Sequence, residues 1–157
     1  MRIRILWVGR TRNPSINDLC LDYLARARRL VPCDIIEVRD FSKSRSLRGA
    51  QLIAKEGAEM AELLPEDSCR IVVLAEKGKQ FSSPEFARWF DKEQNQGTRN
   101  LCFIIGGPEG LSEELVARSH VQLSLGKMTW THEMSRFLLL EQIYRAFSIL
   151  RNIPYQK

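Results

Sequence analysis

The chain has 157 residues and a net charge of +5, which is enough length for one domain with a substantial core but too little for two. With 44% hydrophobic and 27% charged residues, its composition is that of a globular protein, which excludes a disordered chain. No apolar run approaches the roughly 20 residues that span a bilayer, and no signal-peptide cleavage site follows Met1, so we expect a cytoplasmic protein.

Apolar runs of strand length alternate with helical patterns along the chain. In chain order we predict strand 3–8, a helix capped by Asn13 or Ser15, strand 34–38, helix 47–64, strand 70–74, a helix begun by Ser83-Pro84-Glu85, strand 101–105, a short helix from Ser112, strand 121–125 and helix 132–150. Two further loops are predicted, a basic and mobile one at 39–48 and another at 75–82. The alternation predicts a single α/β domain over residues 1–157, with a mostly parallel sheet and helices on both faces.

Residues 101–110, Leu-Cys-Phe-Ile-Ile-Gly-Gly-Pro-Glu-Gly, give the clearest sign of a binding site. A buried strand runs into a turn in which Gly106 and Gly107 permit close approach of a ligand and Pro108 stiffens the backbone. The loops at 75–82 and 126–131 also follow strands, and ligands of open α/β folds bind beyond the carboxyl ends of the strands. The three loops can therefore form one pocket of backbone donors with apolar walls, although each loop alone is better explained as an ordinary connection.

The common phosphate-binding and hydrolase motifs are absent. The chain has no Gly-x-Gly-x-x-Gly, no P-loop and no Gly-x-Ser-x-Gly elbow. This favours a ligand with a neutral ring, such as adenine, over a triphosphate. The cysteines have no Cys-x-x-Cys spacing and the two histidines are far apart, so we predict reduced, mostly buried thiols and no metal site at Cys20, Cys33, Cys69, Cys102, His120 or His132.

The charge is unevenly distributed. Residues 1–55 carry twelve Lys/Arg against five Asp/Glu, residues 127–157 carry five against two, and the middle carries seven against twelve. Two basic ends suit a polyanionic partner, but a solvated surface rich in arginine explains these counts equally well. The cations that would meet phosphates are Arg2, Arg4, Arg10, Arg12, Arg26, Arg28, Arg29, Lys43, Arg45 and Arg48.

Three motifs in order carry a resemblance to a known family. They are Ile104-Ile105-Gly106-Gly107-Pro108-Glu109-Gly110, then Leu123-Ser124-Leu125-Gly126-Lys127-Met128-Thr129, then Leu140-Glu141-Gln142-Ile143-Tyr144-Arg145-Ala146, followed by Pro154-Tyr155. With them the chain resembles, over essentially its whole length, the RlmH family of small SPOUT-class methyltransferases. These enzymes methylate N3 of a pseudouridine in 23S ribosomal RNA, at a site of the 1915 type.

The resemblance implies a C-terminal trefoil knot that binds S-adenosylmethionine, and a homodimer whose substrate pocket is completed across the interface. It assigns cofactor binding to Leu74, Gly106, Leu125, Gly126, Lys127, Met128, Thr129 and Trp130. The partners it implies are 23S ribosomal RNA and the ribosome, with no membrane. Because N3 of the ring must lose a proton, the chemistry calls for a base or for stabilising cations, and our candidates are Arg136, Arg145 and Tyr155, with His132 a weaker one.

Two features leave alternatives open. Arg145 is four residues after Glu141, so the two can pair along a helix instead of meeting RNA. Many relatives have a histidine after the final Pro-Tyr, whereas this chain has Gln156 before Lys157, and glutamine does not titrate near neutral pH. The alternative function is therefore a non-catalytic ribosome-binding module that keeps the fold.

Overall fold

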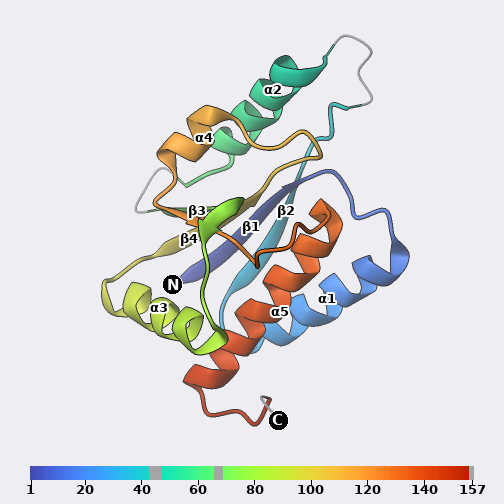
Figure 1. The fold of residues 1–157 in the computed structure, drawn as a ribbon. Helices are drawn as coiled ribbons and strands as arrows, with labels where there is room; N and C mark the ends of the chain where they lie inside the picture. Colours follow the sequence, from blue (N-terminus) through green and yellow to red (C-terminus); the bar gives the residue numbers. More distant parts are fainter. Residues whose placement is uncertain (43–46, 66–68, 156–157) are drawn as a thin grey trace.

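The structure is a computed structural model that describes residues 1–42, 47–65 and 69–155 (Figure 1). Strands and helices alternate through these residues, which confirms the predicted α/β class. The elements are β1 (Arg2–Val8), α1 (Pro14–Arg28), β2 (Cys33–Val38), α2 (Gly49–Glu62), β3 (Cys69–Lys79), α3 (Ser83–Asn95), β4 (Asn100–Ile105), α4 (Glu113–Arg118), β5 (Val121–Leu123) and α5 (His132–Leu150). Lys43, Arg45, Gln156 and Lys157 lie outside the described residues, as does the middle of the loop predicted at 39–48.

The strands form one sheet in the order β2-β1-β4-β3-β5, and every neighbouring pair is parallel. Successive side chains of a strand point to opposite faces, so β1 contributes Ile3, Ile5 and Trp7 to one core and Leu6 and Val8 to the other. Near-continuous apolar strands are the pattern expected of a sheet that is covered on both faces.

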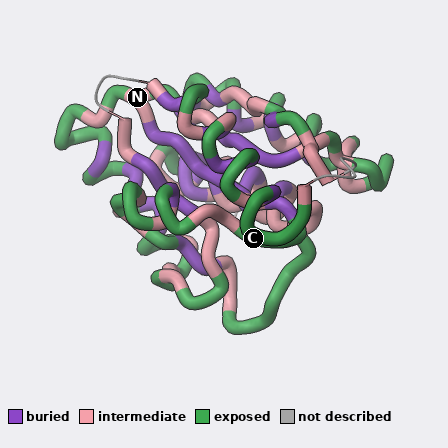
Figure 2. Tube along the Cα trace, turned by 90° about the horizontal axis from the view of Figure 1, so that it is seen from above, coloured by how far each residue is buried: buried purple, intermediate pink, exposed green. Residues whose placement is uncertain are grey.

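Helices cover both faces of the sheet, as predicted. In Figure 1, α2 and α4 lie together at the top, whereas α1, α3 and α5 fill the lower half, and α5 packs against both α1 and α3. Figure 2 shows the buried residues concentrated in the central strands between these two layers. The chain must therefore cross from the edge strand β5 to the opposite face before α5 begins, and it does so at the carboxyl ends of the strands.

The structure differs from the prediction at β3 and β5. The segment predicted as a loop at 75–82 continues β3 as far as Lys79, while β5 ends at Leu123 instead of residue 125. The cause is a bulge, because Leu74 and Lys79 both pair with Leu123 and the residues between them are looped out of register. Gly78 is held against the backbone of β5 there, where a Cβ atom would lie 2.7 Å from the Gln122 carbonyl carbon.

No helix among residues 1–42, 47–65 and 69–155 is long and apolar enough to cross a membrane. Of the four thiols, Cys20, Cys33 and Cys102 are buried and Cys69 is half-buried.

Candidate functional site

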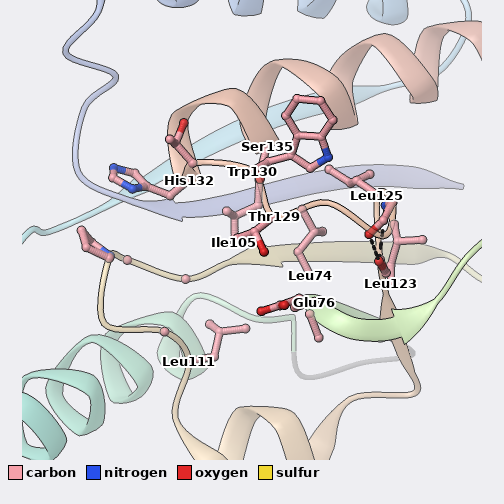
Figure 3. A pocket seen from close by; sticks show the side chains of 18 of the residues that line it. Leu74, Glu76, Ile105, Leu111, Leu123, Leu125, Thr129, Trp130, His132 and Ser135 are labelled. Atoms are coloured by element: carbon pink, nitrogen blue, oxygen red, sulfur yellow. Dashed lines mark hydrogen bonds between the residues drawn. The ribbon is translucent and has the colours of Figure 1, made fainter.

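A pocket of about 620 Å³ lies at the carboxyl ends of β3, β4 and β5 (Figure 3). Leu74 of β3, together with Ile105 and Leu123 at the ends of β4 and β5, lines it, and so does the first turn of α5. All the predicted cofactor-binding residues except Lys127 line it, namely Leu74, Gly106, Leu125, Gly126, Met128, Thr129 and Trp130. The glycine turn, the loop after β5 and residues 75–76 of β3 are thus brought together in one cavity, at the edge of the sheet where ligands of parallel α/β folds bind.

The glycine turn is closed by a hydrogen bond from the Gly110 amide to the Gly107 carbonyl, 3.0 Å long. A Cβ atom on Gly106 would lie 2.7 Å from the Gly110 carbonyl oxygen and 2.9 Å from Cγ of Leu111, so any side chain there would deform the turn. A Cβ atom on Gly107 would press only on the end of the Glu56 side chain, at 3.0 Å, and would lie in ordinary contact with Cβ of Val8 at 3.6 Å. Gly106 therefore sets the shape of this wall of the pocket.

The loop after β5 forms the facing wall. Ser124 is buried, its hydroxyl donates to the Gly126 carbonyl at 2.8 Å, and the Gly126 amide donates back to that hydroxyl at 3.3 Å. Gly126 has φ +154°, a backbone conformation that favours glycine. This folded loop presents Met128 and Trp130 at the rim, where they remain 72% and 39% exposed. Large apolar side chains left exposed beside a cavity are suited to cover an apolar ligand.

The first turn of α5 contributes His132 and Ser135 to the pocket. Thr131 caps this helix by accepting a hydrogen bond from the Met134 amide at 3.3 Å. Burial, reinforced by the nearby Arg136 guanidinium, lowers the pKa of His132 below its ordinary value of 6.5. The imidazole is therefore neutral at physiological pH and able to accept a proton.

Arg136 does not line the pocket. Its side chain is 1% exposed and lies over the Trp7 ring, at 5.0 Å from the centroid. It donates to the Val8 carbonyl at 2.6 Å and to the Thr11 hydroxyl at 2.9 Å, and burial lowers the pKa of the guanidinium. Arg136 therefore binds the end of β1 and the loop after it, and its burial keeps it away from a substrate in the pocket.

Arg145 and Tyr155 meet at the other end of α5. The Arg145 guanidinium donates to the Glu141 carboxylate at 2.9 Å, which confirms the predicted helical pair, and lies over the Tyr155 ring at 4.7 Å from its centroid. The Tyr155 hydroxyl donates to Glu141 at 3.0 Å and shares a 2.8 Å hydrogen bond with the Tyr23 hydroxyl. We call these four residues the tail cluster. Burial and these hydrogen bonds raise the pKa of Tyr155, so its phenol is neutral and does not act as a base.

Several of the arginines predicted to meet phosphates are paired with acidic side chains. Arg2 and Arg28 contact Asp34, and Arg12 contacts Asp40, at 3.6, 3.0 and 3.1 Å. Such exposed pairs contribute little stability, so these arginines can exchange a carboxylate for a phosphate at small cost. Of these paired arginines, Arg10 has the most loosely held side chain, because it is 91% exposed and its guanidinium lies 3.9 Å from the Glu37 carboxylate.

Sequence reasoning did not single out several residues of the pocket. Glu76 and Leu111 lie in two of the segments predicted to form it, 75–82 and 106–111, whereas Val116 enters from α4 without any such prediction. The bulge of β3 at Glu76 has no signal in the local sequence pattern. Over the described part of the chain, no group of three His, Cys, Asp or Glu side chains could hold a metal ion.

Comparison with known proteins agrees with this architecture. A family model described as "Predicted SPOUT methyltransferase" matches residues 1–156. Proteins named ribosomal RNA large subunit methyltransferase H from Geotalea daltonii and Citrifermentans bemidjiense are 39% and 37% identical over 155 residues, covering 99% of this chain and 99% and 98% of theirs.

Among solved structures, a probable methylase family protein from Haemophilus influenzae Rd KW20 superposes with a TM-score of 0.51 at 16% identity, covering 99% of this chain and 70% of that one. At that identity the likeness concerns the fold alone. The family match spans the whole described chain, and the relatives align from end to end. The chain therefore belongs to the SPOUT methyltransferases, within the RlmH family.

Proposed function

We propose that this protein methylates large-subunit ribosomal RNA, transferring the methyl group of S-adenosylmethionine to N3 of a pseudouridine in 23S ribosomal RNA. The relatives that align from end to end carry the name of a large-subunit ribosomal RNA methyltransferase. The observation that carries the proposal is the pocket at the ends of β3, β4 and β5, which combines seven of the residues assigned to the cofactor. A built cavity favours an enzyme over a module that only binds the ribosome.

The chemistry of the pocket suits this cofactor. Its volume falls within the roughly 300–1,000 Å³ of small-molecule sites. Leu74, Leu125 and Met128 can enclose an adenine ring, and the glycine turn brings backbone groups close to its edge. Among the residues that the structure describes, no lysine or arginine lines the pocket, which disfavours a ligand carrying phosphates and suits one whose only charges are a sulfonium and an amino acid group.

When bound, S-adenosylmethionine supplies a methyl group that is already activated by its positive sulfur. The protein must then align the target nitrogen with that methyl group and exclude water, and orientation of this kind contributes about 7–11 kcal/mol in favourable cases. Because N3 carries a proton before transfer, we assign proton acceptance to His132, the neutral imidazole that lines the pocket. Arg136 then has a positioning role, and Arg145 and Tyr155 contact the RNA.

The position of the tail cluster supports a homodimer. At 1.5 Å per residue, Arg145 lies about 20 Å along α5 from His132, so one chain does not bring both to the same base. A second copy that placed its tail cluster over the pocket would complete the site. The apolar side chains of Leu19 and Leu21, 41% and 54% exposed on α1, are available for such an interface.

We also propose a C-terminal trefoil knot and a cytoplasmic location for the protein. The return of the chain from the edge strand β5 to the opposite face of the sheet, before α5, supports the proposal of a C-terminal trefoil knot. Ribosomal RNA as substrate places the protein in the cytoplasm, without a membrane partner.

Primer extension on ribosomal RNA tests this function, because a methyl group on the Watson–Crick face of a pseudouridine stops reverse transcriptase. Cells lacking the gene should lose one stop in 23S ribosomal RNA. Wild-type protein should restore that stop, whereas Gly106→Val should leave it missing. A stop that persists in the deletion strain would refute the proposed site.

A further inference from the structure

Glu76 enters the pocket because β3 is bulged. The register of β3 against β5 breaks between Leu74 and Lys79, and Ala75 and Glu76 in this irregular part of the strand line the pocket. In Figure 3 the Glu76 side chain is drawn between Leu74 and Leu111. Bulges beside functional sites commonly redirect a side chain in this way.

Glu76 is the charged side chain of this cavity. Of the described residues that line it, the others are apolar, small or uncharged, and His132 is neutral at physiological pH because burial lowers its pKa. The chain as a whole carries a net charge of +5, so one negative charge in its main cavity runs against the overall composition. The neighbouring charges Lys77 and Glu109 are exposed and do not line the cavity.

The residues that line the cavity differ in burial. Ile105 and Leu123 are buried and Leu74 is half-buried, whereas Glu76 is exposed. S-adenosylmethionine has a neutral adenine at one end, a cationic sulfonium beyond the ribose, and an amino acid group that carries one ammonium and one carboxylate, so the sulfonium gives the molecule its net positive charge. Its demethylated product, S-adenosylhomocysteine, keeps the ring, the ribose and the ammonium but loses the sulfonium charge.

The geometry points to Glu76 as the residue that distinguishes the charged methyl donor from its neutral product. This inference rests on the proposed function, since it needs S-adenosylmethionine in the pocket. The Glu76 carboxylate attracts the sulfonium before transfer, and the attraction disappears when the methyl group leaves and the sulfur becomes neutral. Release of the product is thereby favoured over release of the donor.

Isothermal titration of three ligands tests this assignment on the full chain, using S-adenosylmethionine, S-adenosylhomocysteine and sinefungin, which carries an amine in place of the sulfonium. Glu76→Gln removes the charge and keeps the size of the side chain. Glu109→Gln is the matched control, because it removes an equal charge from the neighbouring glycine turn without touching the cavity.

For an exposed carboxylate we expect Glu76→Gln to weaken both cationic ligands by about three- to tenfold and to leave S-adenosylhomocysteine within about twofold. Glu109→Gln should change the three affinities by similar small factors. An equal loss for all three ligands in Glu76→Gln would overturn the assignment and place the carboxylate on the ribose or the ammonium. Unchanged affinities would also overturn it. If the wild-type protein binds none of the three, the proposed function itself fails.

Discussion

The Arg136 guanidinium lies 2.6 Å from the Val8 carbonyl oxygen, so the first turns of α5 are hydrogen-bonded to the end of β1. Two more contacts reinforce this junction, because the Glu133 carboxylate accepts from the Arg12 and Asn13 amides at 2.7 and 3.2 Å. The helix that closes the cofactor pocket is therefore fixed to the loop that carries Arg10 and Arg12. RNA bound at that loop would lie next to the pocket.

Replacing Arg136 by methionine should destabilise the fold. The change keeps an apolar stem over Trp7 but leaves the Val8 carbonyl unpaired, which costs about 1–3 kcal/mol. Urea unfolding followed by circular dichroism measures the loss, with the exposed Arg10→Met as the control. Wild-type stability combined with abolished methyl transfer would instead make Arg136 a catalytic residue.

Within the glycine turn, two substitutions should behave differently. Gly106→Ala forces its Cβ atom against the Gly110 backbone and should reduce S-adenosylmethionine affinity by more than about tenfold, since a cofactor wall must move. Gly107→Ala displaces only the end of the Glu56 side chain and should retain most of the affinity. Calorimetric titration compares the two, and equal affinities would show that Gly106 does not shape the site.

The rate of methyl transfer should decrease at acid pH. The pKa of folded His132 is below 6.5, so the imidazole is neutral at pH 7 and becomes protonated, and unable to accept a proton, as the pH falls through that lower value. His132→Asn should lower the rate about 10²-fold and remove this acid limb. Ser135→Ala, at a neighbouring pocket position that does not titrate, should keep the limb. An unchanged profile in His132→Asn would assign the proton to another group.

Protonation of His132 should also lower the stability of the fold at acid pH. Because its pKa is lower in the folded state, the unfolded chain binds more protons as the pH falls below 6.5, and the protein loses stability there. Thermal unfolding between pH 7.5 and pH 5 should show a smaller loss for His132→Asn than for the wild type. Parallel curves for the two proteins would contradict a depressed pKa.

The tail cluster should affect RNA methylation without affecting cofactor binding. Tyr155→Phe removes the hydrogen bonds to Tyr23 and Glu141, whereas Tyr23→Phe removes only the first. We expect Tyr155→Phe to lower the rate on RNA more than Tyr23→Phe, with S-adenosylmethionine affinity unchanged in both. A weakened cofactor affinity in Tyr155→Phe would show that the tail cluster contacts the cofactor and would contradict a role on the RNA alone.

The sequence patterns predict most of the fold because each strand is a short apolar run and most helices begin at a capping residue. Asn13 accepts the Ile16 amide as predicted, but the cap of α3 is Ser82, which accepts the Glu85 amide, instead of the predicted Ser83. Helix α2 begins after Arg48 with no side-chain cap. The patterns also place Leu74, Gly106 and the loop after β5 near one another, since strand ends meet at one edge of a parallel sheet.

The remaining features depend on contacts between distant residues. Arg136 donates hydrogen bonds to Thr11 and Val8, which precede it in the sequence by 125 and 128 positions. Its spacing in the helix therefore does not reveal that it is buried. The bulge that brings Glu76 into the pocket arises because Leu74 and Lys79 of β3 both pair with Leu123. Such a bulge depends on how two strands pair and not on the composition of either strand. Periodicity along one segment carries no information about either.

The most direct test of the central claim is transfer of a radiolabelled methyl group from S-adenosylmethionine to ribosomes from cells that lack the gene, followed by mass spectrometry of the nucleosides. We predict about one methyl group per large subunit, recovered as N3-methylpseudouridine from 23S ribosomal RNA, and none with Gly106→Val. Label that appears on another nucleoside would contradict the assigned site. If the protein binds the cofactor but transfers no methyl group to free 23S ribosomal RNA, large subunits or whole ribosomes, the proposed enzymatic function is wrong.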